Sequence, residues 1–135
     1  MGPLHGTRII EIAGIGPTQL CGMLLADMGA EVLRLRRPAA ADPGVDLPAR
    51  FNLMNRGRPT IDVDLKSDAG RQLVLRLCDT ADVLFEGFRP GVMERLGLGP
   101  ADCMARDERL VYGRMTGWGQ DGPLARRAGH DTNYI

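Results

Sequence analysis

Two short apolar runs with a helical pattern between them restrict the first 35 residues to few folds. Residues 7–13 (TRIIEIA) and 31–35 (EVLRL) are rich in β-branched and other apolar side chains, which is typical of strands. Residues 18–28 (TQLCGMLLADM) repeat apolar side chains at helical spacing. A strand, a crossover helix and a second strand form a β-α-β unit, whose two strands are parallel. The sequence therefore predicts an α/β fold built on a parallel sheet.

The remaining chain continues this alternation. Further strands are expected at 60–63, 83–85 and 110–115, and further helices at 68–78, 91–96 and 100–106. Ser67 is a suitable N-cap for the helix at 68–78. Pro90 suits the first position of the helix at 91–96, because proline lacks the N–H that is unpaired there. Residues 37–55 have no sustained period and are expected to form a long surface loop.

Composition excludes several classes of protein. Seventeen basic residues balance seventeen acidic ones, so bulk charge gives no reason to expect nucleic-acid binding. Three cysteines without a CxxC pair indicate neither a disulfide framework nor a metal site. The first residues lack the pattern of a signal peptide, and no apolar run approaches the ~18 residues of a membrane span. We therefore expect a cytoplasmic protein that binds no membrane.

A glycine pair after the first strand suggests two alternatives. Gly14 and Gly16 match the start of a dinucleotide-binding fingerprint, but Gln19 lies where that motif needs its third glycine. Pro17 lies where a phosphate approaches the helix N-terminus. A structural turn is the preferred interpretation.

Arginines follow two of the expected strands. Arg34, Arg36 and Arg37 close the second strand, where they could bind a phosphate or form a solvated charge cluster. Arginine is the usual choice for gripping phosphate, and Lys66 is the only lysine of the chain.

A second group, of two arginines, follows the strand at 83–85. Arg89 and Arg95 could also bind phosphate, or they could pair with Glu86 and Glu94 on the surface. The residues alone favour the surface pairs.

A glycine-dense segment, residues 113–123 (GRMTGWGQDGP), allows close backbone approach to a ligand. Trp118 within it could pack the loop onto the domain. His130 follows, and histidine is the commonest general base near neutral pH. The other histidine, His5, lies near the N-terminus and is a poor candidate for catalysis.

Taken together, the segments resemble one family along the whole chain. They are GPLHGTRIIEIAGIGP, LLADMGAEVLRLRRP, NRGRPTIDVDLKSDAGR, ADVLFEGFRPGVMERLGLGP, RLVYGRMTGWGQDGP and AGHDTNYI. This series is similar to the family III CoA-transferases, and most closely to their α-methylacyl-CoA racemase branch. The order of FRPGVMERLGLG and TGWGQDGP makes the resemblance specific.

The resemblance implies a large α/β domain with a Rossmann-like parallel sheet and flanking helices, a smaller second domain, and two chains interlocked as a homodimer. Residues 1–135 would be the N-terminal portion of the large CoA-binding domain, without the small domain or the C-terminal return of the chain.

The resemblance also implies a site for an acyl-CoA substrate, with CoA as part of the thioester and no separate cofactor. The residues expected to contact CoA are Arg37, Val63, Asp64, Leu65, Lys66, Gly87, Phe88, Arg89 and Arg95. Those expected around the thioester are Gly129, Asp131, Thr132, Asn133 and Tyr134. Residues 39–50 match the family least, and nothing is transferred to them.

In the racemase branch, His130 would be one of two groups that exchange the proton α to the thioester. The other would be an aspartate beyond position 135. A CoA-transferase of the same family would instead carry the acyl group on an aspartate as a mixed anhydride. The histidine favours the racemase, since transferases usually have a non-catalytic residue there. A third possibility is a non-catalytic, truncated product.

Overall fold

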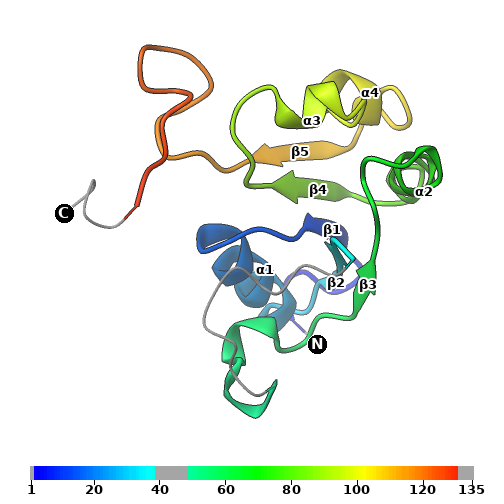
Figure 1. Ribbon diagram of the computed structural model, residues 1–135. Helices are drawn as coiled ribbons and strands as arrows, with labels where there is room; N and C mark the ends of the chain where they lie inside the picture. Colours follow the sequence, from blue (N-terminus) through cyan, green and yellow to red (C-terminus); the bar gives the residue numbers. More distant parts are fainter. Residues whose placement is uncertain (1, 39–48, 131–135) are drawn as a thin grey trace.

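The fold is a five-stranded parallel sheet with helices on both faces (Figure 1). The structure, a computed structural model, describes residues 2–38 and 49–130. Its elements are β1 (Arg8–Ile12), α1 (Pro17–Asp27), β2 (Glu31–Arg36), the 3₁₀ turns η1 (Ala49–Phe51) and η2 (Leu53–Asn55), β3 (Thr60–Asp62), α2 (Asp68–Cys78), β4 (Val83–Glu86), α3 (Val92–Arg95), α4 (Pro100–Met104) and β5 (Val111–Arg114). The predicted α/β fold with a Rossmann-like parallel sheet is confirmed.

The strand order reverses once, between β1 and β4. The strands lie in the order β3-β2-β1-β4-β5, so the chain first builds outward from β1 through β2 to β3. Helix α2 then carries it back across the sheet to β4, and β5 extends the other side. In open α/β sheets, ligands bind beyond the carboxyl ends of the strands at such a switch point. The topology therefore places the candidate site at the carboxyl edge.

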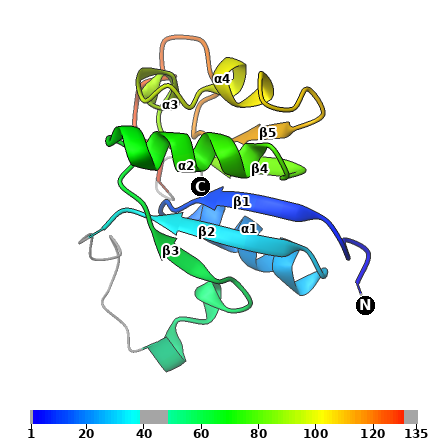
Figure 2. The ribbon, with the colours of Figure 1, turned by 90° about the vertical axis from the view of Figure 1, so that its right-hand side faces the viewer.

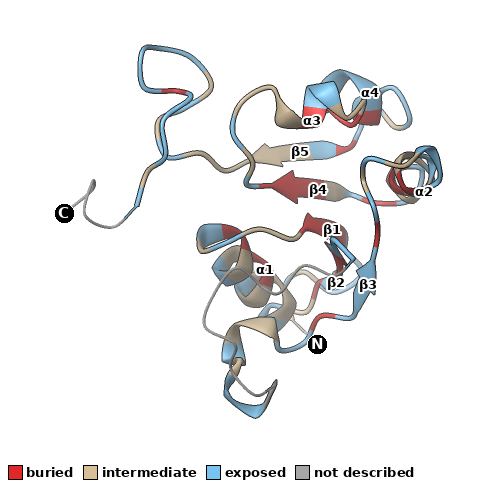
Figure 3. Cartoon of the chain, viewed as in Figure 1, coloured by how far each residue is buried: buried red, intermediate tan, exposed pale blue. Residues whose placement is uncertain are grey.

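Helices cover the two faces of the sheet unequally. Helix α1 lies on one face, whereas α2 lies on the opposite face (Figure 2). Because side chains alternate along a strand, Ile10 and Leu84 pack on the face with α2, α3 and α4, and Ile9 and Phe85 pack on the α1 side. Figure 3 shows burial concentrated in β1 and β4, the strands that flank the switch point.

Helix starts were predicted with mixed success. Helix α2 begins as predicted, because Gly70 N donates a 3.0 Å hydrogen bond to Ser67 Oγ at its N-cap. The position predicted for Pro90 is wrong, since α3 begins at Val92. Its N-cap, Gly91, has a left-handed backbone with φ +81°, which separates the proline from the helix.

The apolar spacing of α1 predicts the helix correctly but does not mark its buried face. Leu20, Leu24 and Met28 are exposed, whereas Thr18 and Gly22 are its buried residues. Gly22 faces the sheet without a side chain, and a Cβ there would meet Glu11 and Arg58.

These charged groups form a buried cluster of Glu11, Arg34 and Arg58. Arg58 Nη1 donates to Glu11 Oε2, and Arg34 Nε lies 3.4 Å from Glu11 Oε1. Arg58 Nη2 also donates to the carbonyl of Met54. Burial raises the pKa of the Glu11 carboxyl, and the two guanidinium groups, Arg58 more than Arg34, oppose this change. The cluster thus joins β1, β2 and the segment that leads into β3.

Replacing Arg58 with leucine should destabilise the fold strongly, because Glu11 would keep a buried charge without the Arg58 guanidinium. Loss of one partner of a buried ion pair costs about 3–5 kcal/mol. The matched control is Arg56→Leu, which removes an exposed pair with Asp27 and should cost less than about 1 kcal/mol. Urea unfolding of the full-length protein measures both. Equal losses for the two variants would contradict the role given to the cluster.

Gly22→Ala should also destabilise the protein, although alanine is normally the better helix former by about 1 kcal/mol. A Cβ at Gly22 would overlap Glu11 Oε2 and Arg58 Nη1. Overpacking of this kind costs about 1–3 kcal/mol. Thermal unfolding checks the sign of the change, with Gln19→Ala in the same helix as control. A higher melting temperature for Gly22→Ala would disprove the close approach of α1.

Candidate active site

All five strands end at the same edge of the sheet, and the segments expected to contact CoA follow them directly. Arg37 follows β2, residues 63–66 follow β3, and residues 87–89 follow β4. The parallel topology therefore brings segments that are distant in sequence to one edge.

The end of β2 separates the three arginines that sequence analysis grouped together. Arg34 points into the core against Glu11 and lies outside the site. Arg36 Nε donates a 2.8 Å hydrogen bond to Asp62 at the end of β3, and this bond lowers the pKa of Asp62. Arg37 is exposed beside this pair. Of the three, Arg37 is therefore the arginine best placed to meet a ligand.

The segment after β3 is a tight turn before α2. Val63 is buried in the core, Leu65 is half-buried, and Asp64 and Lys66 are exposed. Asp64 Oδ1 accepts a 3.0 Å hydrogen bond from Lys66 N, and the Asp64 carbonyl accepts one of 2.8 Å from Ser67 Oγ. Val63 is therefore part of the core, with its N–H donating a 2.7 Å hydrogen bond to the Arg36 carbonyl, whereas the exposed Lys66 can offer its charge to a ligand.

The turn after β4 packs against the first turn of α1. A Cβ on Gly87 would lie 2.7 Å from Thr18 Cγ2, so only glycine fits between them. Phe88 N donates a 2.6 Å hydrogen bond to Glu86 Oε2. Phe88 is half-buried and Arg89 is exposed, so this turn presents a cation at the edge of the sheet.

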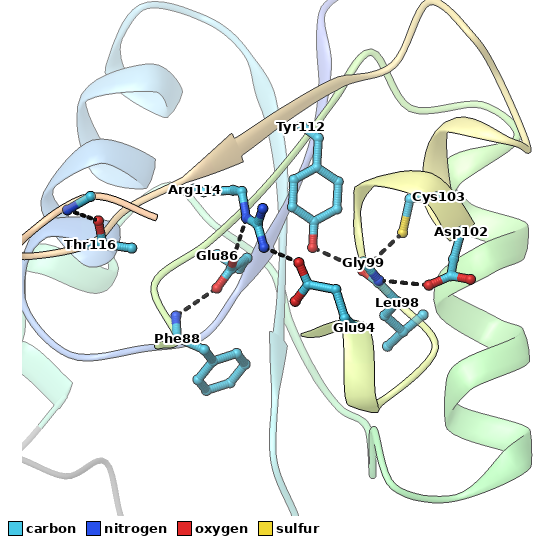
Figure 4. Close-up of polar contacts among 11 residues, drawn as sticks. Glu86, Phe88, Glu94, Leu98, Gly99, Asp102, Cys103, Tyr112, Arg114 and Thr116 are labelled. Carbon is cyan, nitrogen blue, oxygen red and sulfur yellow. Dashed lines mark hydrogen bonds and ion pairs between the residues drawn. The ribbon is translucent and has the colours of Figure 1, made fainter. Parts of the chain in front are cut away.

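The surface pairs preferred for Arg89 and Arg95 are not found. Both glutamates proposed as partners face Arg114 of β5 instead (Figure 4). Arg114 Nη2 donates to Glu94, and Arg114 Nε lies 3.8 Å from Glu86 Oε1. The sequence could not reveal this, because the pairing depends on the register of β4 and β5, which places Glu86 opposite Arg114.

The turn between α3 and α4 is attached to β5 as well. Tyr112 OH donates a 2.9 Å hydrogen bond to the carbonyl of Leu98, which also accepts a 3.3 Å hydrogen bond from Cys103 Sγ (Figure 4). Burial raises the pKa of the Tyr112 phenol well above its ordinary value, so it remains a hydrogen-bond donor. Arg114 and Tyr112 of β5 therefore hold the C-terminal half of α3 and the turn that follows it.

A cavity of about 380 Å³ opens between the start of α3 and the glycine-rich loop after β5, residues 115–130. Its lining includes Pro90, Gly91, Arg95, Gln120, Asp121 and Arg126. Arg126 was missed by sequence analysis, because nothing in its local pattern distinguishes it from the neighbouring Arg127. The fold places it in the same cavity as Arg95, which provides two cations and one carboxylate for a polar ligand.

The loop after β5 is held by its own polar contacts. Trp118 Nε1 donates a 3.2 Å hydrogen bond to the carbonyl of Ala128, and Gly119 N donates one of 2.9 Å to Thr116 Oγ1. Gly119 and Gly122 have positive φ, which explains why glycine stands at these two positions. Trp118 thus links the two ends of the loop, which projects from the sheet (Figure 1).

His130 is the last described residue of this loop and is exposed, next to the half-buried Gly129. Asp131, Thr132, Asn133 and Tyr134 lie outside the described residues. His5 is exposed near the N-terminus, before β1.

Within residues 2–38 and 49–130, no three His, Cys, Asp or Glu side chains gather as metal ligands would. None of the helices in the same ranges has the length and hydropathy of a membrane span.

A doubly wound α/β domain with cationic side chains at its carboxyl edge is typical of enzymes that bind phosphate-bearing ligands. Residues 4–135 match the family model of CoA-transferase family III, and the chain belongs to this family. It is 42% identical over 132 residues to alpha-methylacyl-CoA racemase of Mus musculus, covering 98% of this chain and 32% of the relative. It is also 42% identical over 138 residues to a probable fatty acyl-CoA transferase, Rv3272, of Mycobacterium tuberculosis, covering 96% of this chain and 35% of the relative.

A crystal structure of Rv3272 has the same fold. It superposes with a TM-score of 0.89 at 40% identity, covering 97% of this chain and 37% of that one. The chain therefore spans about a third of the length of the relatives it matches.

Proposed function

We propose that the protein containing this chain epimerises 2-methylacyl-CoA thioesters by removing and returning the proton at the α-carbon. The observation that carries this proposal is His130, an exposed histidine at the end of the glycine-rich loop. The 42% identity to a racemase supports it, within a family that contains both racemases and CoA-transferases.

The chemistry explains why a histidine is needed. Inversion at the α-carbon requires a base on one face and an acid on the other, each with a pKa near the working pH. His130 would serve on one face, and an aspartate beyond position 135 on the other. The enolate formed between the two steps needs hydrogen-bond donors aimed at the thioester oxygen. Backbone N–H groups of residues 129–133 are the proposed donors.

The CoA moiety would lie along the carboxyl edge. Arg37 and Arg89 are exposed beyond β2 and β4, and Arg95 and Arg126 line one cavity. Arginine matches phosphate oxygens with two parallel N–H groups, so these residues suit the phosphates of CoA. Lys66 would add a further charge. The substrate thioester itself supplies CoA, and we propose no additional cofactor.

The second candidate is transfer of CoA between carboxylic acids. Its support is the equal identity to Rv3272, which is named as a probable fatty acyl-CoA transferase. Both reactions would use the same CoA site, so the two candidates differ in the role of His130. A racemase requires this histidine for proton exchange, whereas a transferase requires an aspartate that accepts the acyl group.

Racemisation predicts solvent exchange at the α-carbon. The full-length protein, incubated in D2O with one epimer of a 2-methylacyl-CoA, should incorporate deuterium at that carbon and form the other epimer. His130→Ala should reduce both by about 10²–10⁴-fold, the usual contribution of a general base. NMR follows both signals, and His5→Ala is the matched control that should retain activity. Transfer to a free carboxylate without exchange would instead identify the transferase.

Arg126→Ala should weaken binding of the acyl-CoA, because it removes a cation from the cavity that holds Arg95. A charged hydrogen bond is worth about 1.5–3 kcal/mol, which corresponds to at least a tenfold rise in Kd. Arg127→Ala changes a neighbouring exposed arginine outside the cavity lining and should leave Kd unchanged. Isothermal titration of both variants separates a local contact from a general loss of charge.

A further inference from the structure

Glu86 ends β4 at the carboxyl edge of the sheet and is only 2% exposed. Removing a carboxylate from water is costly unless other groups bind it. Burial raises the pKa of this carboxyl, and the Phe88 N–H and then Arg114 oppose the change. The groups that contact Glu86 therefore indicate what its buried charge stabilises.

The first of these groups is the backbone of the turn after β4. Phe88 N donates a 2.6 Å hydrogen bond to Glu86 Oε2. Bonds from an N–H to a charged acceptor are stronger than neutral ones. On its other side the turn is packed through Gly87 against Thr18 of α1. The Glu86 carboxylate thus fixes the path of residues 87–89 as they leave the sheet.

The second group is Arg114, which extends the contact to α3. Its guanidinium lies between Glu86 and Glu94, so the three side chains form a row from β4 through β5 to α3 (Figure 4). Glu94 directly precedes Arg95 in this short helix. The backbone N–H of Glu94 and then Arg114 lower the pKa of the Glu94 carboxyl, which favours its charged form. The row therefore attaches α3, which carries Arg95, to β5.

We propose that Glu86 is a positioning residue, which holds the turn with Arg89 directly and the helix with Arg95 through Arg114 and Glu94. The ligand that Arg89 and Arg95 would bind is the CoA part of an acyl-CoA, and this identity rests on the proposed function. Glu86 acts through its neighbours, so its loss changes ligand affinity and leaves the chemical step intact.

Glu86→Gln in the full-length protein tests this role. The amide oxygen can still accept from Phe88 N, but it no longer carries the charge that pairs with Arg114. We expect KM for a 2-methylacyl-CoA, and Kd for 2-methylpropanoyl-CoA, to rise roughly tenfold while kcat stays within about twofold. Glu86→Ala, which loses both contacts, should show a larger rise. Glu31→Gln, at the opposite edge of the sheet, is the control and should match the wild type.

Hydrogen exchange gives a readout that does not depend on the ligand. Peptides covering residues 87–95 should exchange faster in Glu86→Gln than in the wild type, whereas peptides from α2 should not change. Glu94→Gln provides a second variant that is safer for folding, because the Glu94 side chain is 44% exposed. It should raise Kd in the same direction by a smaller factor, and it decides the question alone if Glu86→Gln does not fold.

The outcomes separate the inference from the proposed function. If the wild type binds 2-methylpropanoyl-CoA and both Glu86→Gln and Glu94→Gln bind it equally well, the positioning role is wrong and the proposed function stands. A fall in kcat with unchanged KM would also overturn the positioning role. If the wild type itself binds no CoA thioester, the proposed function fails and this inference fails with it.

Discussion

The buried contact of Glu11 with Arg34 and Arg58 is the constraint on which the first half of the sheet depends. A carboxylate between two guanidinium groups is tolerated inside a protein only when each charge has a partner. Because the three residues come from β1, β2 and the segment before β3, they fix how these parts meet. Gly22 lets α1 lie directly over them. The cost of leaving any charge unpaired therefore favours one arrangement over alternatives with a similar apolar core.

A second buried glutamate, Glu86, occupies the strand on the other side of the switch point. Glu11 contacts side chains within the sheet and under α1, whereas Glu86 contacts the turn that leaves the sheet. The two carboxylates thus stabilise different parts of the fold. One holds the strands together, and the other holds the edge where we propose that CoA binds. A buried glutamate near the end of a strand can therefore stabilise either the sheet itself or the turn that leaves it, and only its contacts distinguish the two roles.

Much of the fold could be predicted from local sequence. The strands of the β-α-β unit and the start of α2 follow from β-branched runs, helical spacing and the Ser67 cap, all of which act over a few residues. Errors occurred where a distant group decided the outcome. The exposed Leu20 and Leu24 belong to an apolar pattern that would normally mark a buried face, but the face of α1 that lies over Glu11 and Arg58 is the one with Gly22.

The sequence by itself determined the fold class, the family and the residues expected at the site, because periodicity and the order of motifs can be read along the chain without knowing its contacts. Only the tertiary structure decided which charges meet. Arg34 and Arg36 lie two residues apart on one strand, yet one is buried against Glu11 and the other pairs with Asp62 at the surface. Likewise, Arg114 pairs with Glu86 and Glu94, while Arg126 joins Arg95 in a cavity. Strand register and helix packing set these pairings, and both depend on contacts between residues far apart in sequence.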